Sequence, residues 1–251
     1  MTVVFVHGNP ETPAIWDLLA ARLAEAGQTD QVRLAPPGFG APVPVGFGST
    51  AREYRDWLLA ELAQFAEPID LVGHDLGGGF VVDVMTTRPE LVRSWVSDAV
   101  GVFDPDYVWH DLAQVWQTPG DGEAWVARSL LQTPADRAAG TATLGLDPVI
   151  GTRIGAGFDE AMGESILRFY RATPQSVLAS IGANLEVAVA RPGLALLPSE
   201  DPFCGTDEQR RRSAARAGAE VAELPDLGHW WMTQADGHPA AAALIKFWDS
   251  L

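Results

Sequence analysis

Asp75 lies where an apolar run meets a helical pattern, in the segment Ile-Asp-Leu-Val-Gly-His-Asp-Leu-Gly-Gly-Gly-Phe over residues 69–80. A strand, a sharp G-x-D-x-G turn and a helix form the context of a nucleophile elbow, here with aspartate in place of the usual serine. Gly73 and Gly77 flank the turn, where strand and helix approach closely and a residue without a Cβ atom is favoured. A carboxylate in this position can attack a substrate carbon and form a covalent ester.

Two other interpretations of Asp75 stay open at this point. Aspartate is a common N-cap residue, and Asp75 could simply cap the helix that begins near Gly77. The three glycines over 77–79 could also open a phosphate-binding helix, but such a motif normally supplies a cation, and this loop places a carboxylate where the anion would bind.

A base and an acid that could serve a covalent mechanism follow Asp75 along the chain. A predicted strand over 194–197 runs into Ser-Glu-Asp-Pro, which contains Asp201, and His229 follows in Leu-Gly-His-Trp. We expect His229 to activate water and Asp201 to orient its imidazole. Glu200 and Asp98 are alternative acids, Asp201 could be only a turn residue, and His229 could be only a hydrogen-bonded loop histidine.

Together these residues resemble the α/β-hydrolase superfamily, in particular the epoxide hydrolase and haloalkane dehalogenase branch, whose members use G-H-D-x-G with an aspartate nucleophile. The resemblance covers nearly the whole chain. It rests on H-G-x-P at 7–10, Pro-Gly-Phe-Gly at 37–40, G-H-D-L-G-G at 73–78, a helical insertion at about 102–185, Asp201 and Gly228-His229. The resemblance implies an α/β-hydrolase fold in which the two strands that normally precede H-G-x-P are missing, and hence a sheet of about six strands.

The resemblance also implies an oxyanion hole. In this fold the loop after the first strand and the residue after the nucleophile supply backbone N–H donors, and here these are Asn9 and Leu76. His7 then braces the loop and does not react.

Two chemistries fit this branch, and they differ in the group that stabilises the leaving atom. Epoxide opening needs a proton donor, commonly a cap tyrosine in a Tyr-Arg dipeptide, which points to Tyr170, although Tyr170 could instead only pack in the cap. The second cap tyrosine of epoxide hydrolases is not evident, and Leu112 lies near its place. Halide release commonly uses a tryptophan after the nucleophile, where this chain has leucine, with Asn9 or a second tryptophan as the other donor. We expect Trp109, Trp116 and His110 of the cap to line the substrate site, and either tryptophan could replace the missing halide donor.

The elements that position these residues alternate between strand and helix patterns, as expected for a parallel sheet covered by helices. Strands are predicted over 2–6, 31–35, 69–73, 93–97, 194–197 and 219–224, and helices over 13–26, 50–65, 77–88 and 236–250. The runs VVFV, VRLA and IDLV predict strands that are buried on both faces. We expect a core over 1–101 and 186–251, with a helical, Trp-rich cap over 102–185 inserted between the two parts.

The amino-acid composition argues against several classes of protein. Net charge is −16, and the 17 cationic residues include one lysine, so no basic patch for nucleic acid is expected. One cysteine excludes an internal disulfide, no Cys/His cluster has metal-ligand spacing, and no apolar stretch reaches the ~18 residues of a membrane span. The absence of a charged leader before residue 2 favours a cytoplasmic protein. A trimmed sheet would expose a different edge, and a homo-oligomer is one arrangement that would cover it.

The sequence thus predicts an epoxide hydrolase that acts through Asp75 on a small uncharged hydrophobic substrate, without metal or organic cofactor. Haloalkane dehalogenation by the same covalent mechanism is the first alternative. The second is a non-catalytic protein of the same fold that binds a ligand without turnover.

Overall fold

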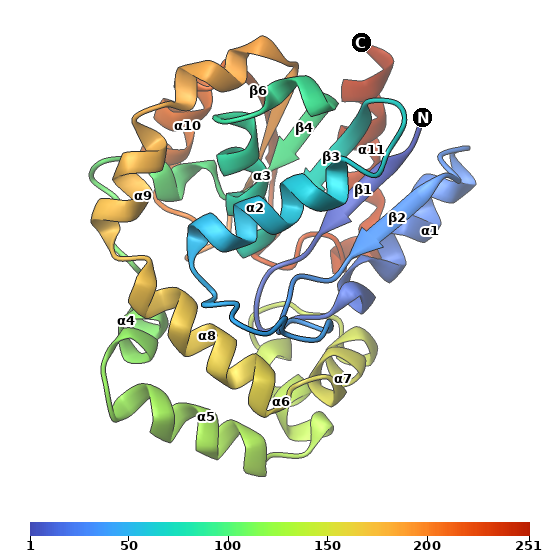
Figure 1. Ribbon diagram of the computed structural model, residues 1–251. Coiled ribbons are helices and arrows are strands. Elements are labelled where there is room, and N and C mark those ends of the chain that lie inside the picture. The colour runs from blue at the N-terminus through green and yellow to red at the C-terminus, as the bar shows by residue number, and fades with distance from the viewer.

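A computed structural model describes all 251 residues. Its centre is a six-stranded, fully parallel sheet in the order β2-β1-β3-β4-β5-β6, seen in Figure 1. The strands are β1 (Val3–Val6), β2 (Gln31–Leu34), β3 (Ile69–Gly73), β4 (Val92–Ser97), β5 (Gly193–Pro198) and β6 (Ala219–Leu224). The predicted α/β-hydrolase architecture with about six strands is confirmed.

Helices cover both faces of this sheet. The helices outside the β4–β5 connection are α1 (Asp17–Glu25), α2 (Ala51–Leu62), α3 (Leu76–Met85), α10 (Asp207–Arg216) and α11 (His238–Asp249). Short 3-10 turns are η1 (Pro13–Trp16), η2 (Pro89–Leu91), η3 (Val100–Phe103), η4 (Leu185–Ala190) and η5 (Gln234–Gly237). The predicted helix over 13–26 therefore starts as a 3-10 turn and becomes α-helical at Asp17.

Alternation along β1 shows how the sheet divides the core in two. Val4 and Val6 point into one apolar cluster with side chains of α2, α3 and α10, whereas Val3 and Phe5 point into the other with side chains of α1 and α11. Because successive side chains of a strand face opposite sides, an apolar run without polar interruption fits a strand that is covered on both faces. All four residues of β1 are fully buried.

The strand over 31–34 departs from the prediction. We expected VRLA to belong to a strand buried on both faces, but β2 pairs only with β1 at the edge of the sheet, and Arg33 is exposed. An edge strand has a neighbour on one side only, so solvent reaches its side chains. The prediction of burial at this strand was wrong.

The connection from β4 to β5 is entirely helical. Its helices are α4 (Asp111–Gln117), α5 (Asp121–Leu131), α6 (Pro134–Ala142), α7 (Pro148–Ala156), α8 (Glu160–Ala172) and α9 (Gln175–Gly182). Figure 1 shows α4–α8 gathered at one end of the molecule, away from the sheet, while α9 runs back beside it.

Helix α8 docks this segment onto the core through aromatic residues. The ring of Phe169 lies with its centroid 5.8 Å from those of both Tyr54 on α2 and Phe80 on α3. Tyr170 is the next residue and is buried on the same helix. Packing of this kind, with tilted aromatic rings, fixes the angle at which α8 presents Tyr170 to the centre of the molecule.

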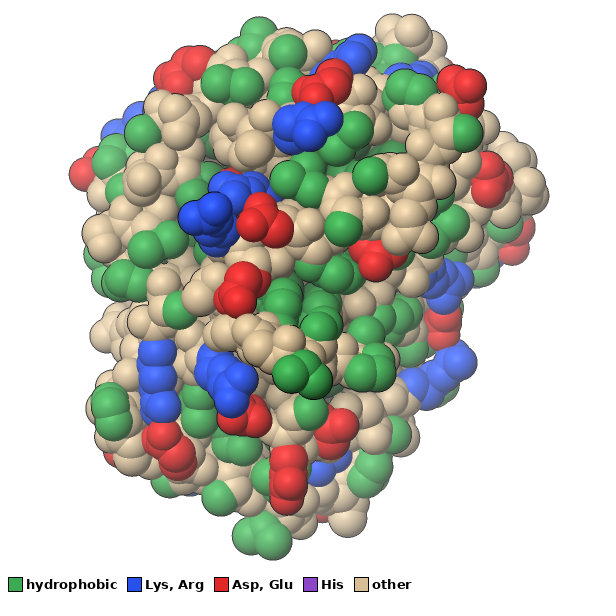
Figure 2. All heavy atoms as spheres, in the orientation of Figure 1, with side chains coloured by type: hydrophobic (Ala, Val, Ile, Leu, Met, Phe, Trp, Pro, Cys, Tyr) green, Lys and Arg blue, Asp and Glu red, His purple; other side chains and the backbone are tan.

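Charges on the surface are interspersed. On the face in Figure 2, cationic and anionic side chains lie beside each other. Ion pairs on the surface include Arg168–Glu164 and Arg171–Glu123. No large basic patch is visible on this face. No helix combines the length and the apolar character that crossing a bilayer requires.

Candidate active site

The carboxyl ends of the parallel strands bring the candidate residues to one edge of the sheet. His7 follows β1, Asp75 follows β3, Asp98 follows β4 and Asp201 follows β5. In sheets of this kind, ligands bind in the crevice outside these strand ends.

Asp75 occupies a strained turn between β3 and α3. Its φ of 50° and ψ of −122° lie outside the regions that non-glycine residues favour. Its backbone N–H donates to Asp98 Oδ1 at 3.0 Å, and its side chain makes no capping hydrogen bond to α3. The interpretation of Asp75 as a mere helix N-cap is therefore wrong.

Close approach of three backbone segments explains the glycines around this turn. A Cβ atom on Gly77 would lie 2.2 Å from the Val6 carbonyl oxygen, and one on Gly73 would lie 2.5 Å from that of Gly77. Gly8 has the same constraint toward the Asp75 side chain, because a Cβ atom on Gly8 would lie 2.4 Å from Asp75 Oδ2. These positions let the loop after β1 contact the Asp75 carboxylate directly.

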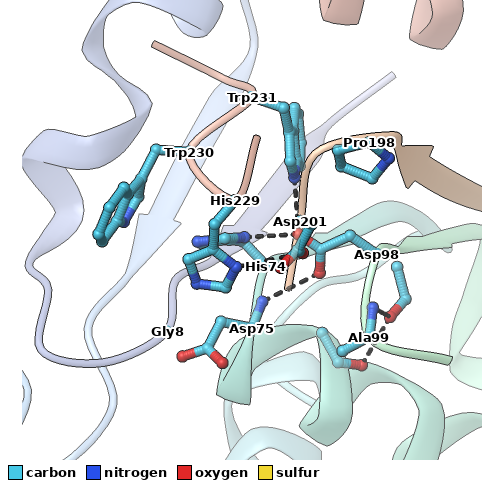
Figure 3. A network of polar contacts seen from close by, with 12 residues as sticks. Gly8, His74, Asp75, Asp98, Ala99, Pro198, Asp201, His229, Trp230 and Trp231 are labelled. Carbon is cyan, nitrogen blue, oxygen red and sulfur yellow. Dashed lines mark hydrogen bonds and ion pairs between the residues drawn. The ribbon is translucent and has the colours of Figure 1, made fainter. Parts of the chain in front are cut away.

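His229 and Asp201 meet as expected. His229 Nδ1 lies 3.2 Å from Asp201 Oδ2, and Asp201 Oδ1 accepts the backbone N–H of Phe203 at 2.8 Å. The carboxylate accepts, so Nδ1 carries the proton and Nε2 is left as the basic nitrogen. Figure 3 shows His229 beside Asp75. Of the alternative acids, Glu200 is exposed and Asp98 contacts His74 instead.

Burial and charge act on the ionisation of these three residues. Burial raises the pKa of Asp75, which the His229 and His74 cations and the Asn9 N–H partly offset. Burial lowers the pKa of His229, but the Asp201 carboxylate outweighs it, and the net pKa lies above 6.5. Burial raises the pKa of Asp201, whereas His229 lowers it more, so Asp201 stays ionised.

Asn9 contacts both Asp75 and the helical β4–β5 connection. Its backbone N–H donates to Asp75 Oδ2 at 2.9 Å, and its side-chain Nδ2 donates to the Tyr170 hydroxyl at 2.9 Å while lying 3.4 Å from Asp75 Oδ2. The backbone N–H of Asn9 thus lies within reach of the Asp75 carboxyl group, and its role as an oxyanion donor stays a prediction. Leu76, the other, makes no hydrogen bond to this carboxylate, and its role stays a prediction.

Tyr170 on α8 reaches the loop after β1 with its hydroxyl group. It is fully buried, accepts from Asn9, and uses its own proton in no hydrogen bond to the protein. Burial, with a contribution from Asp75, raises the pKa of Tyr170 well above 10, so the phenol keeps its proton at neutral pH. A protonated hydroxyl here can donate to a bound molecule.

Two cavities lie beside Asp75. The larger, of about 140 Å³, is lined by catalytic candidates and apolar cap residues, among them Asn9, Asp75, Trp116, Tyr170 and His229. The smaller, of about 30 Å³, is lined mostly by apolar side chains, including Leu76, Phe80 and Trp109. Asp75, His110 and Phe203 line both cavities, so the Asp75 side chain lies between them.

The three predicted substrate-lining residues all reach these cavities, with different polar capacity. Trp109 Nε1–H donates to the Thr173 carbonyl at 2.9 Å, whereas Trp116 Nε1–H is buried without a partner. His110 Nδ1 accepts the Ala113 N–H at 3.2 Å, and burial lowers its pKa to about 4, so the ring is neutral. Tyr107, buried nearby, donates its hydroxyl proton to the Phe203 carbonyl.

Two groups of side chains come close enough together to resemble metal sites. They are Glu11, His74 and His229 in one case and Asp201, Cys204 and His229 in the other, with ligand atoms within 4.8 Å of one another. In the first group both nitrogens of His74 already contact carboxylates. In the second, burial raises the pKa of the Cys204 thiol well above its usual range, so it stays protonated and is a weak ligand. We assign neither group as a metal site.

Sequence reasoning missed a buried layer behind Asp75. Glu11, directly after H-G-N-P, contacts His74 and the indole N–H of Trp230, and Trp231 donates to Asp98. The available signal was local: an acid and two tryptophans adjoin motifs that were already recognised.

Comparisons with known proteins agree with this architecture. The sequence profile described as the alpha/beta hydrolase family matches residues 3–243. No curated protein sequence matches the chain.

Solved structures of similar fold are numerous. A mutant of DbjA has a TM-score of 0.72 at 19% identity, covering 99% of this chain and 91% of that one. E-2-(acetamidomethylene)succinate hydrolase has a TM-score of 0.71 at 17% identity, with coverage of 99% and 91%. The haloalkane dehalogenase DbeA from Bradyrhizobium elkani has a TM-score of 0.70 at 19% identity, with coverage of 100% and 91%.

At these identities the structural similarity establishes the fold alone, while the profile spans nearly the entire sequence. The chain belongs to the alpha/beta hydrolase family.

Proposed function

We propose that this hydrolase opens an epoxide to a diol through a covalent alkyl ester on Asp75. The observation that carries the proposal is the position of Asn9 Nδ2, which lies 2.9 Å from the Tyr170 hydroxyl and 3.4 Å from Asp75 Oδ2. The carboxylate that attacks and the hydroxyl that donates the proton thus both lie beside the side-chain amide of Asn9. An epoxide presents a carbon and an oxygen joined by one bond, and this spacing suits simultaneous attack on the first and protonation of the second.

In the first step, Asp75 attacks a ring carbon and the carbon–oxygen bond breaks. Its electrons go to the oxygen, which takes the proton of Tyr170. The Tyr170 proton is available because no protein acceptor engages it, in contrast to that of Tyr107, which is donated to Phe203. The result is an ester of Asp75 that carries the new hydroxyl group.

In the second step, His229 Nε2 takes a proton from water, and the hydroxide attacks the Asp75 carboxyl carbon. The Asn9 N–H stabilises the oxyanion on Asp75, and the His229 imidazolium gives its proton to the departing alkoxide. The new Asp75 carboxylic acid returns a proton to Tyr170. One epoxide and one water give one diol, and Asp201 keeps the imidazole in the required tautomer.

The proposed substrate is small, uncharged and hydrophobic. Its support is the lining of the two cavities, in which aromatic and aliphatic side chains surround a few polar groups. We propose residues 102–185 as the cap that encloses it, since Trp116 and Tyr170 from this segment line the larger cavity. No cofactor takes part in these steps.

Release of halide from a haloalkane is the second candidate, and one observation favours it. Trp116 Nε1–H is buried and unpartnered at the larger cavity, and Asn9 Nδ2 lies at the same cavity. Two N–H donors could stabilise a leaving halide with no proton transfer. Trp109 is unsuited to this role because its N–H is donated to Thr173.

A matched substrate panel separates the two chemistries. Terminal epoxides, haloalkanes of the same chain length and simple acyl esters are incubated with wild type and with Asp75→Ala, and diol, halide and carboxylic acid are measured. We expect diol from wild type and none from Asp75→Ala. Halide without diol would favour the second candidate, and acyl-ester hydrolysis that survives in Asp75→Ala would overturn both.

A further inference from the structure

A fully buried group of charged and indole side chains lies directly behind Asp75, and we call Glu11, His74, Asp98, Trp230 and Trp231 the His74 cluster. His74 Nδ1 lies 2.5 Å from Asp98 Oδ2, and its Nε2 lies 3.1 Å from Glu11 Oε1. The side chains of His74 and Asp98 are 0% exposed and that of Glu11 is 1% exposed. Each nitrogen of one imidazole therefore faces a different carboxyl group (Figure 3 shows the Asp98 side).

The hydrogen bonds of Glu11 favour its ionised form. Its Oε2 accepts the Gly8 N–H at 3.1 Å, and its Oε1 accepts the Trp230 Nε1–H at 2.7 Å in addition to His74. Both partners are donors only, so the group must accept at both oxygens. Glu11 is ionised; although burial raises its pKa, His74 outweighs this and brings the net pKa to about 2.

Asp98 also accepts hydrogen bonds at both oxygens. Its Oδ1 accepts the Asp75 N–H at 3.0 Å, and its Oδ2 accepts the Trp231 Nε1–H at 2.6 Å. A neutral imidazole carries one N–H and could donate to only one of two carboxylates. Only the imidazolium, with both nitrogens protonated, can donate to both groups at once; burial lowers the pKa of His74, but Glu11 and Asp98 outweigh it and raise that pKa well above 6.5.

We propose that His74 is a permanent imidazolium and a positioning residue: its fixed charge keeps Asp75 ionised and His229 free of a second proton. The first part rests on the contacts and burial of the His74 cluster, while the second rests on the proposed function, in which His229 is the base. Through Asp98, His74 also braces the strained Asp75 turn, because one Asp98 oxygen contacts His74 and the other contacts the Asp75 N–H.

The position of His74 beside His229 gives the charge its effect. The two ring centroids lie 4.6 Å apart, and like charges at this separation disfavour each other. Burial lowers the pKa of His229 and Asp201 raises it more; the His74 charge then limits that rise. The titratable groups around the two rings are His7 and Glu11 after β1, Asp75 on the elbow, Asp98 after β4, His110 before α4, and Asp201 and Cys204 after β5.

Two near-isosteric substitutions on one ion pair test the proposal. His74→Gln removes the cation and should raise the pKa of His229 by roughly one unit or more. Glu11→Gln removes one anion while Asp98 keeps His74 protonated, and it should lower the pKa of His229. A role in packing alone would move both variants in the same direction or move neither, so either of those results would overturn the electrostatic part.

The readout is NMR titration of the ¹⁵N-labelled histidine rings in wild type and both variants, which needs no substrate. In wild type, both ring nitrogens of His74 should stay protonated from about pH 5 to about pH 9, far across the usual histidine pKa of ~6.5. Loss of a proton near that usual value would overturn the proposal, even if neither variant folds. If epoxides are not opened but His74 keeps both protons, the imidazolium stands and the proposed function fails.

The functional consequence is measured on whichever substrate wild type hydrolyses. The acid limb of kcat against pH, measured where the hydrolytic step that uses His229 limits turnover, should move to higher pH in His74→Gln and to lower pH in Glu11→Gln. Activity that falls in both variants with an unmoved acid limb would assign His74 a structural role only.

Discussion

Replacing Tyr170 with phenylalanine removes a single oxygen from the proposed active site. That hydroxyl accepts from Asn9 Nδ2 at 2.9 Å and offers its own proton to the larger cavity. Phenylalanine keeps the aromatic packing of Tyr170 against Trp109 and Trp116, whose ring centroids lie 4.9 Å and 4.7 Å away. The substitution therefore isolates the role of the proton donor.

The expected magnitudes are well separated. Loss of one hydrogen bond destabilises a fold by about 1 kcal/mol, and Asn9 Nδ2 keeps Asp75 Oδ2 at 3.4 Å as a partner, so the variant should fold. Loss of general-acid catalysis lowers a rate by roughly 10²–10⁴-fold, which corresponds to about 3–5 kcal/mol of activation free energy. We therefore expect a much larger effect on the rate of the alkylation step than on the stability of the fold.

The assay is single-turnover formation of the Asp75 ester from an epoxide in a background that cannot hydrolyse it. Tyr107→Phe is the matched control, because Tyr107 is equally buried but donates its proton to a backbone carbonyl. We expect slow alkylation in Tyr170→Phe and nearly wild-type alkylation in the control. Equal, small effects in the two variants would refute Tyr170 as the acid.

Three further predictions concern the base, the elbow and a buried ion pair. The net pKa of His229 lies above 6.5, so ester hydrolysis should accelerate as pH rises through it, and Asp201→Asn should move this rise to lower pH. Because folding raises the pKa of His229, protonation of His229 stabilises the fold at pH values below ~6.5, and this stabilisation is lost as pH rises above the pKa of the folded state. Asp201→Asn should therefore lower Tm more at about pH 5.5 than at about pH 8.5. An equal loss of Tm at both pH values would contradict the assignment of Asp201 as the partner of His229. Gly77→Ala would place a Cβ atom 2.2 Å from the Val6 carbonyl oxygen and should lower the free energy of unfolding, measured in urea, by about 1–3 kcal/mol. Gly140→Ala on α6, with open space around it, should raise the free energy of unfolding by about 0.5–1 kcal/mol. The reverse order of stabilities would be inconsistent with the packing. Asp70→Ala removes the buried partner of the half-buried Arg93 and should lower the free energy of unfolding by about 2 kcal/mol, because charge-assisted hydrogen bonds of Asp70 are lost while Arg93 can still reach solvent. Glu90→Ala, in an exposed pair with Arg88, should change it by less than about 1 kcal/mol, and similar values from both would contradict the burial argument.

The elements that surround Asp75 could be predicted because their causes are local. A continuous apolar strand, two glycines and a helical pattern are visible in consecutive residues, and β3 and α3 appear where that pattern places them. The pairing of Asp201 with His229 was also predictable, since both side chains follow strands whose ends must meet at one edge of the sheet.

Other features depend on contacts that no local pattern encodes. Nothing in residues 31–35 reveals that this strand has one neighbour, so its exposure was missed. The partner of Asp98 was open for the same reason: a carboxylate at that position could reach either histidine, and packing of Glu11 and Trp231 around His74 decides the outcome. Which tryptophan keeps a free N–H likewise depends on Thr173, which is remote in sequence from Trp109.

Intact mass of His229→Gln after exposure to substrate tests the central claim most directly. The variant retains Asp75 and Tyr170 but lacks the base that activates water, so the covalent ester should accumulate. We predict a mass increase equal to one epoxide molecule, which peptide mapping places on Asp75 and which does not form in His229→Gln/Asp75→Ala. An unchanged mass with every epoxide and haloalkane tested, while wild type hydrolyses simple acyl esters, would contradict the carboxylate-nucleophile mechanism.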